Sequence, residues 1–115
     1  MAYIDTQKVK EIRNKIKKQF PEFKFSIVRE HYSTVKISII EGSVDLGETY
    51  QQLNPYYLER IENQALRELA QEILKIVRET VEVKYHETGD YGSQPNYYTY
   101  IQVGKWDKHY KNNAA

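Results

Sequence analysis

The chain has 115 residues, 40% of them hydrophobic, which predicts a single domain over residues 1–115 with a packed core. It contains no cysteine, which excludes disulfides and thiol chemistry, and its apolar runs are too short to cross a bilayer. The net charge is +1, but residues 1–40 hold nine basic against four acidic side chains and residues 41–82 hold four against nine. This division argues against nucleic-acid binding over the whole surface and against mimicry of DNA. The N-terminus lacks the profile of a signal peptide, so we expect a soluble, cytoplasmic protein with no membrane partner.

The first element predicted along the chain is a helix that starts near Gln7 and ends before Pro21. Asp5 or Thr6 is the expected cap, because a side-chain oxygen there accepts hydrogen bonds from unpaired amides of the first turn. Pro21 ends the helix, because proline disfavours helical geometry in the residue before it. The apolar face of this helix comprises Val9, Ile12, Ile16 and Phe20.

Two strands with alternating apolar residues follow, and a hairpin is the simplest connection between them. The apolar positions are Phe23, Phe25 and Ile27 in the first strand and Val35, Ile37 and Ile39 in the second. A period of two gives each strand one apolar face. Residues 29–33 form the connection, without the Asn-Gly pair that is typical of the tightest hairpin turns.

A second helix is predicted after residues 41–54, which have no clear period. Asn54 and Pro55 open this helix as its cap and first residue. We expect it to end near Glu79, with a break around residues 62–63. Its apolar stripe comprises Leu58, Ile61, Ala65, Leu66, Leu69, Ile73, Ile76 and Val77.

Two further strands are predicted at residues 81–86 and 98–103, where apolar and polar residues alternate again. Residues 87–96 between them are rich in turn formers and predict a mobile loop, and residues 110–115 predict a frayed tail. The order of elements is therefore α-β-β-α-β-β. We predict an α+β two-layer sandwich, in which both helices cover one face of a four-stranded antiparallel sheet.

The sheet face turned away from the helices carries side chains that are suited to binding. Its expected members are Lys24, Ser26, Lys36, Ser38, Lys84, His86, Tyr98 and Tyr100. Tyrosine rings and ammonium groups on a sheet supply the stacking and phosphate contacts that single-stranded nucleic acid needs. The same side chains are also typical of an ordinary solvated face with packing between strands.

Residues 97–110 hold four of the eleven tyrosines and the only tryptophan. Such side chains bury a large area and keep a hydrogen-bonding group, as protein interfaces require, although they also favour strands. We therefore predict an anchor for a partner protein in this segment. The candidate partner-binding residues are Tyr98, Tyr100, Lys105 and Trp106, together with His31, Tyr32, Lys24 and Lys36.

No pattern in the sequence predicts catalysis, a metal site or a cofactor. The histidines, His31, His86 and His109, lie far apart and lack the spacing of metal ligands. The common hydrolase and metalloprotease motifs are absent from the sequence. We therefore expect a protein that is not an enzyme and needs no cofactor, with an enzyme lacking a recognised motif as a third alternative.

Several residue strings occur in an order that resembles a large polyvalent protein-associated domain family. They are Met1-Ala2-Tyr3-Ile4, Val9-Lys10-Glu11-Ile12-Arg13, Phe20-Pro21-Glu22-Phe23-Lys24-Phe25-Ser26, His31-Tyr32-Ser33-Thr34-Val35, Tyr50-Gln51-Gln52-Leu53-Asn54 and Gly104-Lys105-Trp106-Asp107-Lys108. The resemblance covers most of the chain, in order from Met1 to Lys108. The resemblance supplies no catalytic residues. The positions that it marks for testing are His31, Tyr32, Ser33, Tyr50, Gln51, Gln52, Lys105, Trp106 and Asp107.

The resemblance implies a module of phages, plasmids and other mobile elements. Such modules occur alone or inside very large proteins that are thought to enter a host cell with the element's DNA, which implies a counter-defence or DNA-establishment setting. We expect a binding protein of mobile-element origin that acts by stoichiometric contact with a protein complex of the host or the element. Its sharpest form is an anti-CRISPR-like inhibitor. The alternative is an accessory module that binds single-stranded nucleic acid.

Overall fold

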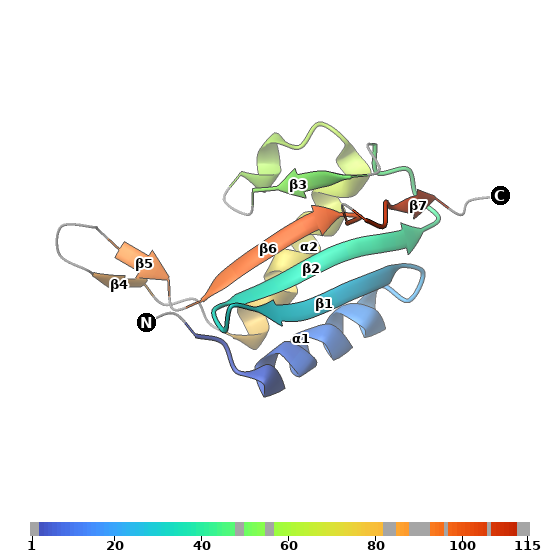
Figure 1. Cartoon of the computed structure of the whole chain (residues 1–115). Helices are drawn as coiled ribbons and strands as arrows, with labels where there is room; N and C mark the ends of the chain where they lie inside the picture. The colour runs from blue at the N-terminus through green and yellow to red at the C-terminus, as the bar shows by residue number, and fades with distance from the viewer. Residues whose placement is uncertain are drawn as a thin grey trace.

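Within the residues that the computed structural model describes, two α-helices cover one face of a mixed β-sheet (Figure 1). These residues are 3–47, 50–54, 57–81, 85–87, 93–95, 97–105 and 107–112. The elements in chain order are α1 (Thr6–Gln19), β1 (Lys24–Glu30), β2 (Thr34–Gly42), β3 (Gln51–Leu53), the 3₁₀ helix η1 (Leu58–Arg60), α2 (Gln64–Thr80), β4 (Tyr85–Glu87), β5 (Ser93–Pro95), β6 (Tyr98–Val103) and β7 (Lys111–Asn112). The predicted α+β class with two helices is therefore confirmed.

The main sheet has the strand order β1-β2-β6-β3, with β7 also paired to β2. Strands β1 and β2 form the predicted antiparallel hairpin. Strand β6 lies parallel to β2, with Val35 opposite Thr99 and Ile37 opposite Ile101, and β3 runs antiparallel along the other side of β6. The chain passes through α2 between β2 and β6, and a long connection of this kind is what parallel neighbours require.

The prediction of a purely antiparallel, four-stranded sheet is wrong. Alternating apolar residues indicate which face of a strand is buried, but they carry no information on the direction of its neighbour. Strand β3 falls in the segment expected to be irregular, because three residues are too few to show a period. Strand β4 does not pair with β6 as expected, but pairs with β5 in a separate two-stranded sheet.

Helix α1 forms where the sequence predicts it. Asp5 is the N-cap, and its Oδ1 accepts a hydrogen bond from the backbone amide of Gln7 at 2.7 Å. The buried residues are Val9, Ile12 and Ile16. Arg13 reaches the edge of the sheet, where its Nε and Nη2 donate to the carbonyl of Ile27 at 3.2 and 2.9 Å. This contact attaches the helix to β1 and covers part of an edge strand.

Helix α2 begins later than the sequence pattern indicates. Its cap is Asn63, whose Oδ1 accepts from the amide of Leu66 at 3.0 Å, and Asn54 does not cap it. The break expected around residues 62–63 is thus the start of the helix, and η1 precedes it. Pro55 lies outside the described residues. The buried face of α2 comprises Leu66, Leu69, Ala70, Ile73, Leu74 and Val77, which share one core with α1 and the main sheet.

A tyrosine closes the base of the β4–β5 hairpin. Tyr97 is buried, and its hydroxyl donates a hydrogen bond to the carbonyl of Val81. Burial raises the pKa of Tyr97 to about 12. The bond to Val81 joins the end of α2 to the start of β6. Figure 1 shows the β4–β5 hairpin projecting from the main sheet. Strand β5 falls within the predicted loop at 87–96, of which residues 88–92 and 96 lie outside the described part.

Residues 110–112 are part of the packed fold, whereas the sequence predicts a frayed tail from residue 110. Tyr110 is buried, and its hydroxyl donates to the carbonyl of Val44 at 2.6 Å. Lys111 and Asn112 then pair with Glu41 and Gly42 at the end of β2. A single buried ring therefore secures a segment of polar composition, which a reading of composition alone does not detect.

Candidate partner-binding face

The sheet face opposite the helices, which we call the open face, is organised by strand register. The alternation that buries Ile37 and Ile101 against the helices turns their neighbours in sequence to this face. The pairing of the strands then aligns these neighbours in rows across the sheet. Two such rows are Val28–Lys36–Tyr100 and Ser26–Ser38–Gln102–Gln52.

A hollow of about 290 Å³ opens over these two rows. Its lining comes from four strands of the main sheet and from the residues just before β3 and just after β6. These residues are Ser26, Val28, Lys36, Ser38, Tyr50, Gln52, Tyr100, Gln102, Lys105 and Asp107. Because most of them stand on paired strands, the hollow has a rigid base, and its lining combines aromatic rings with hydrogen-bonding groups.

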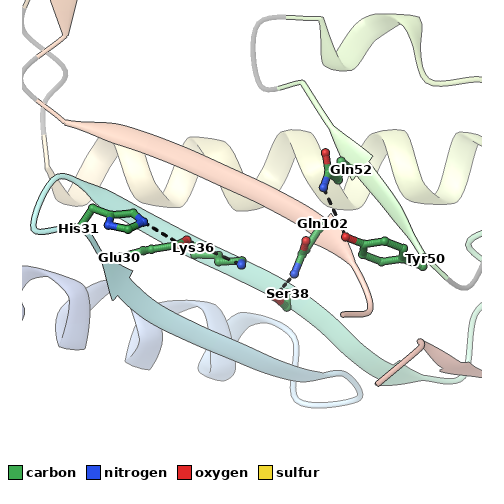
Figure 2. Close-up of polar contacts among 7 residues, drawn as sticks. All are labelled: Glu30, His31, Lys36, Ser38, Tyr50, Gln52 and Gln102. Atoms are coloured by element: carbon green, nitrogen blue, oxygen red, sulfur yellow. Dashed lines mark hydrogen bonds and ion pairs between the residues drawn. The ribbon is translucent and has the colours of Figure 1, made fainter. Parts of the chain in front are cut away.

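An uncharged polar pair forms the floor of the hollow. Ser38 is 1% exposed and Gln102 is 3% exposed. The Nε2 of Gln102 donates to the Oγ of Ser38 at 2.9 Å (Figure 2). Polar side chains are costly to bury unless they are hydrogen-bonded, and this bond satisfies part of that need. Apolar residues at these two positions would need no hydrogen bond, yet the sheet has a polar pair there.

Aromatic rings stand around this floor. The hydroxyl of Tyr50 accepts a hydrogen bond from Nε2 of Gln52 at 3.3 Å, as Figure 2 shows. The ring of Tyr50 also stacks on His109, with centroids 6.1 Å apart and planes at 7°. Across the hollow, the ammonium of Lys36 lies 5.7 Å from the ring centroid of Tyr100, within the range of a cation–π contact.

Carboxylates accompany the cations of this face. Glu30 lies 3.7 Å from the Nζ of Lys36 and 3.6 Å from the Nε2 of His31 (Figure 2). Lys24 lies 3.1 Å from a carboxylate oxygen of Glu41. Partial burial raises the pKa of Tyr100, and the nearby Tyr50 and Glu30 add to this effect. The electrostatic character of the open face is therefore mixed, without an excess of positive charge at these positions.

The structure brings part of the predicted partner-binding set together. Lys36, Tyr100 and Lys105 line the hollow. Tyr98 stands on the same face beside Thr34 and is 39% exposed.

Three other predicted residues, Lys24, His31 and Tyr32, lie apart from the hollow. His31 and Tyr32 belong to the hairpin turn between β1 and β2. Lys24 is largely exposed and lies at the start of β1, the end away from that turn. Trp106 and Lys84 lie outside the described residues.

Sequence reasoning missed Gln102, which forms the floor. Its position two residues after Tyr100, on the same strand face, was the available signal. Tyr50, Gln52 and Asp107 were marked by the family resemblance but were not assigned to the binding face. Their place in the hollow depends on β3 and on the turn after β6, and neither shows a period in the sequence.

Within the described residues, no cluster of histidine and carboxylate side chains is arranged to hold a metal ion. Within the same part of the chain, no helix has the length and apolar character needed to cross a membrane.

The chain matches a known protein family. Residues 4–91 match the family described as large polyvalent protein associated domain 29. This region is well over half of the chain, so the chain belongs to that family, and the resemblance inferred from the residue strings is confirmed. No curated protein and no solved structure matches the chain. The matched region ends before β6, so Tyr100, Gln102 and Lys105 lie beyond it.

Proposed function

We propose that this protein is a non-enzymatic binding module and that the hollow on its open face receives part of a partner protein in a stoichiometric complex. The observation that carries the proposal is the polar floor of Ser38 and Gln102 beneath Tyr50 and Tyr100. Buried, preorganised polar groups next to tyrosine rings are the features that give protein interfaces their specificity and their anchors.

The floor pair has complementary groups left for a ligand. Its hydrogen bond uses one amide hydrogen of Gln102 and one lone pair of Ser38. Within the described residues these two side chains form no other hydrogen bond, so the pair retains a carbonyl acceptor and a hydroxyl donor. A peptide group or an amide side chain presents the matching donor and acceptor. The partner segment is therefore expected to place such a group in the hollow.

Single-stranded nucleic acid is the second candidate ligand, favoured by the contact between Lys36 and Tyr100. The charges of the open face favour a protein ligand over single-stranded nucleic acid. Lys36 and Lys24, two of the lysines expected to contact phosphate, each lie beside a carboxylate, and Asp107 lines the hollow with Lys105. A phosphate chain needs a run of available cations. A protein segment of mixed character does not.

The biological setting proposed for this complex is that of a mobile element inside a host cell. Membership of the large polyvalent protein associated domain 29 family supports this setting. In its sharpest form, the module inhibits a host defence complex, as an anti-CRISPR protein does, by covering a surface of that complex. Inhibition by contact requires affinity and specificity but no reaction, which agrees with a floor built from an amide and a hydroxyl.

The test is capture from host-cell lysate on the immobilised protein, with and without nuclease, followed by mass spectrometry. The baits are the wild type, Tyr100→Ala and the matched control Tyr57→Ala, which removes an exposed ring outside the hollow. We expect a nuclease-resistant protein that the wild type and the control retain and that Tyr100→Ala loses. Recovery that nuclease abolishes, or that Tyr100→Ala leaves unchanged, would contradict the proposal.

A further inference from the structure

The turn between β1 and β2 has a backbone conformation that its residues disfavour. His31 and Tyr32 have φ angles of 54° and 63°, in the left-handed region where glycine and asparagine are the usual residues. For a bulky residue such as Tyr32 this conformation is energetically unfavourable, and strain of this kind gathers at functional sites. Tyr32 is 68% exposed, so burial in the core does not explain its presence.

Tyr32 is one side of an aromatic clamp on an arginine. The guanidinium carbon of Arg29 lies 5.0 Å from the ring centroid of Tyr32 and 5.8 Å from that of Tyr3. Tyr3 is itself 57% exposed. Two hydrogen bonds connect the three residues through Ile4, the neighbour of Tyr3. The amide of Ile4 donates to the carbonyl of Tyr32 at 2.8 Å, and the side-chain Nη1 of Arg29 donates to the carbonyl of Ile4 at 3.4 Å. We call Tyr3, Arg29 and Tyr32 the arginine clamp.

The guanidinium in this clamp has no carboxylate partner within the described part of the chain. The ion pairs found there include Glu30, the next residue in sequence, but Glu30 contacts Lys36 and His31. Arg29 has five N–H donors, and its one hydrogen bond to a described residue is the bond to Ile4. A half-buried, aromatic-flanked guanidinium is weakly hydrated, which suits it to form a two-pronged contact with a carboxylate.

We propose that the arginine clamp is a second binding site, which takes an aspartate or glutamate side chain of a partner protein. The rings of Tyr3 and Tyr32 would pack on the stem of that side chain while Arg29 binds its carboxylate. A single cation in contact with two rings matches one carboxylate better than the successive phosphates of a nucleic acid, which require a series of cations. Arginine and tyrosine are also the residues most often found as interface hot spots.

This site is separate from the hollow. Arg29 pairs in register with Val35, which is buried on the helix side of the sheet, whereas Lys36 and Ser38 of the same strand face the hollow. The clamp therefore stands on the other side of the sheet, at the hairpin end. It does not depend on the function proposed for the hollow, and either site can fail its test without affecting the other.

The test is an NMR titration of the full-length, ¹⁵N-labelled protein with a capped peptide Gly-Glu-Leu-Glu-Gly. The matched peptide Gly-Gln-Leu-Gln-Gly and a short oligothymidylate are titrated in parallel. We expect saturable shifts at the amides of Arg29 and Tyr32 with the glutamate peptide alone. Equal shifts with the glutamine peptide, shifts confined to other residues, or shifts at these amides with the oligothymidylate would overturn the proposal.

Variants separate binding from folding. Arg29→Gln should weaken binding of the glutamate peptide by about tenfold or more. Arg29→Lys keeps the charge but loses the planar guanidinium, so its affinity should lie between those of Arg29→Gln and the wild type. Tyr32→Asn should weaken binding without lowering the melting temperature, because asparagine tolerates the left-handed conformation. Tyr57→Ala, which removes a ring that packs on Arg60, is the control and should bind as the wild type does. Wild-type affinity in both Tyr32→Asn and Arg29→Gln would refute the site.

Discussion

Gln102 donates a hydrogen bond to Ser38 at 2.9 Å across two parallel strands, although the two residues are 64 positions apart in the sequence. The bond forms only because α2 returns the chain to the same end of the sheet and aligns β6 beside β2. The bond joins β6, near the end of the chain, to the β1–β2 hairpin. The floor of the hollow therefore depends on the parallel pairing of β2 and β6.

The first prediction concerns this floor pair. Ser38→Ala should lower the free energy of unfolding by about 1–3 kcal/mol, because it leaves the buried amide of Gln102 without its acceptor. The double variant Ser38→Ala/Gln102→Leu should cost less than the sum of the two single variants, since it removes both polar partners. Urea denaturation of the four proteins measures this coupling. Strictly additive changes would show that the two side chains do not interact.

A second prediction concerns the core that supports the open face. Ile37 and Leu69 were predicted to be core residues, and both are buried, at 0% and 6% exposure. Truncation of either to alanine should lower the free energy of unfolding by about 2–5 kcal/mol, because each leaves a cavity. Val28→Ala on the open face is the control, since Val28 is 46% exposed. A loss for Ile37→Ala no larger than that for Val28→Ala would show that the two faces are assigned in reverse.

A third prediction follows from the pKa of Tyr97, which burial raises to about 12 from the ordinary value of 10.0. The folded state holds this proton more tightly than the unfolded state. The stabilisation is therefore fully present below pH 10 and is lost as the pH rises through the folded pKa.

The comparison with Tyr97→Phe isolates this effect. Below pH 10 the variant should be less stable by about 1 kcal/mol, because it lacks the hydrogen bond to Val81. Between pH 10 and 12 the wild type should lose stability more steeply than the variant, so that the difference shrinks. Chemical denaturation across this range measures it, and a difference that stays constant would mean that Tyr97 does not titrate as described.

A fourth prediction tests the alternative ligand. Binding of a short oligothymidylate should be no tighter than the non-specific range, roughly 10⁻⁴–10⁻⁶ M at physiological salt, and should weaken steeply as salt rises. The reason is that carboxylates accompany Lys24 and Lys36. Fluorescence anisotropy at several salt concentrations measures the affinity. A salt-resistant, sequence-selective complex of nanomolar affinity would make nucleic acid the preferred ligand.

Much of the architecture was predictable because local patterns determine it. Asp5 and the spacing of Val9, Ile12 and Ile16 define α1, and the alternation around Ile37 defines the hairpin with its two faces. The open-face positions of Lys36 and Tyr100 follow from the same alternation. These features depend on the period of the chain within one element, which the sequence displays directly.

The remaining features depend on contacts between distant segments. The parallel direction of β6, the pairing of the short β3 and the docking of Tyr110 on Val44 each require a partner that no local period reveals. The hollow forms where β3 pairs with β6, so Tyr50 and Gln52 were not assigned to the binding face. Of the arginine clamp, only Tyr32 is among the residues predicted from the sequence, because the contact of Arg29 with Tyr3 joins the start of the chain to the end of β1.

The most direct test of the central claim is the affinity of the captured partner protein for Tyr100→Ala, measured by calorimetry beside the wild type and Tyr57→Ala. If Tyr100 is an anchor of the hollow, its truncation should cost about 2 kcal/mol or more, which is roughly thirtyfold in affinity. Thermal unfolding of the same samples should show little change, because Tyr100 stands on the open face. Unchanged affinity of the folded Tyr100→Ala protein would contradict the claim that the hollow is the partner-binding site.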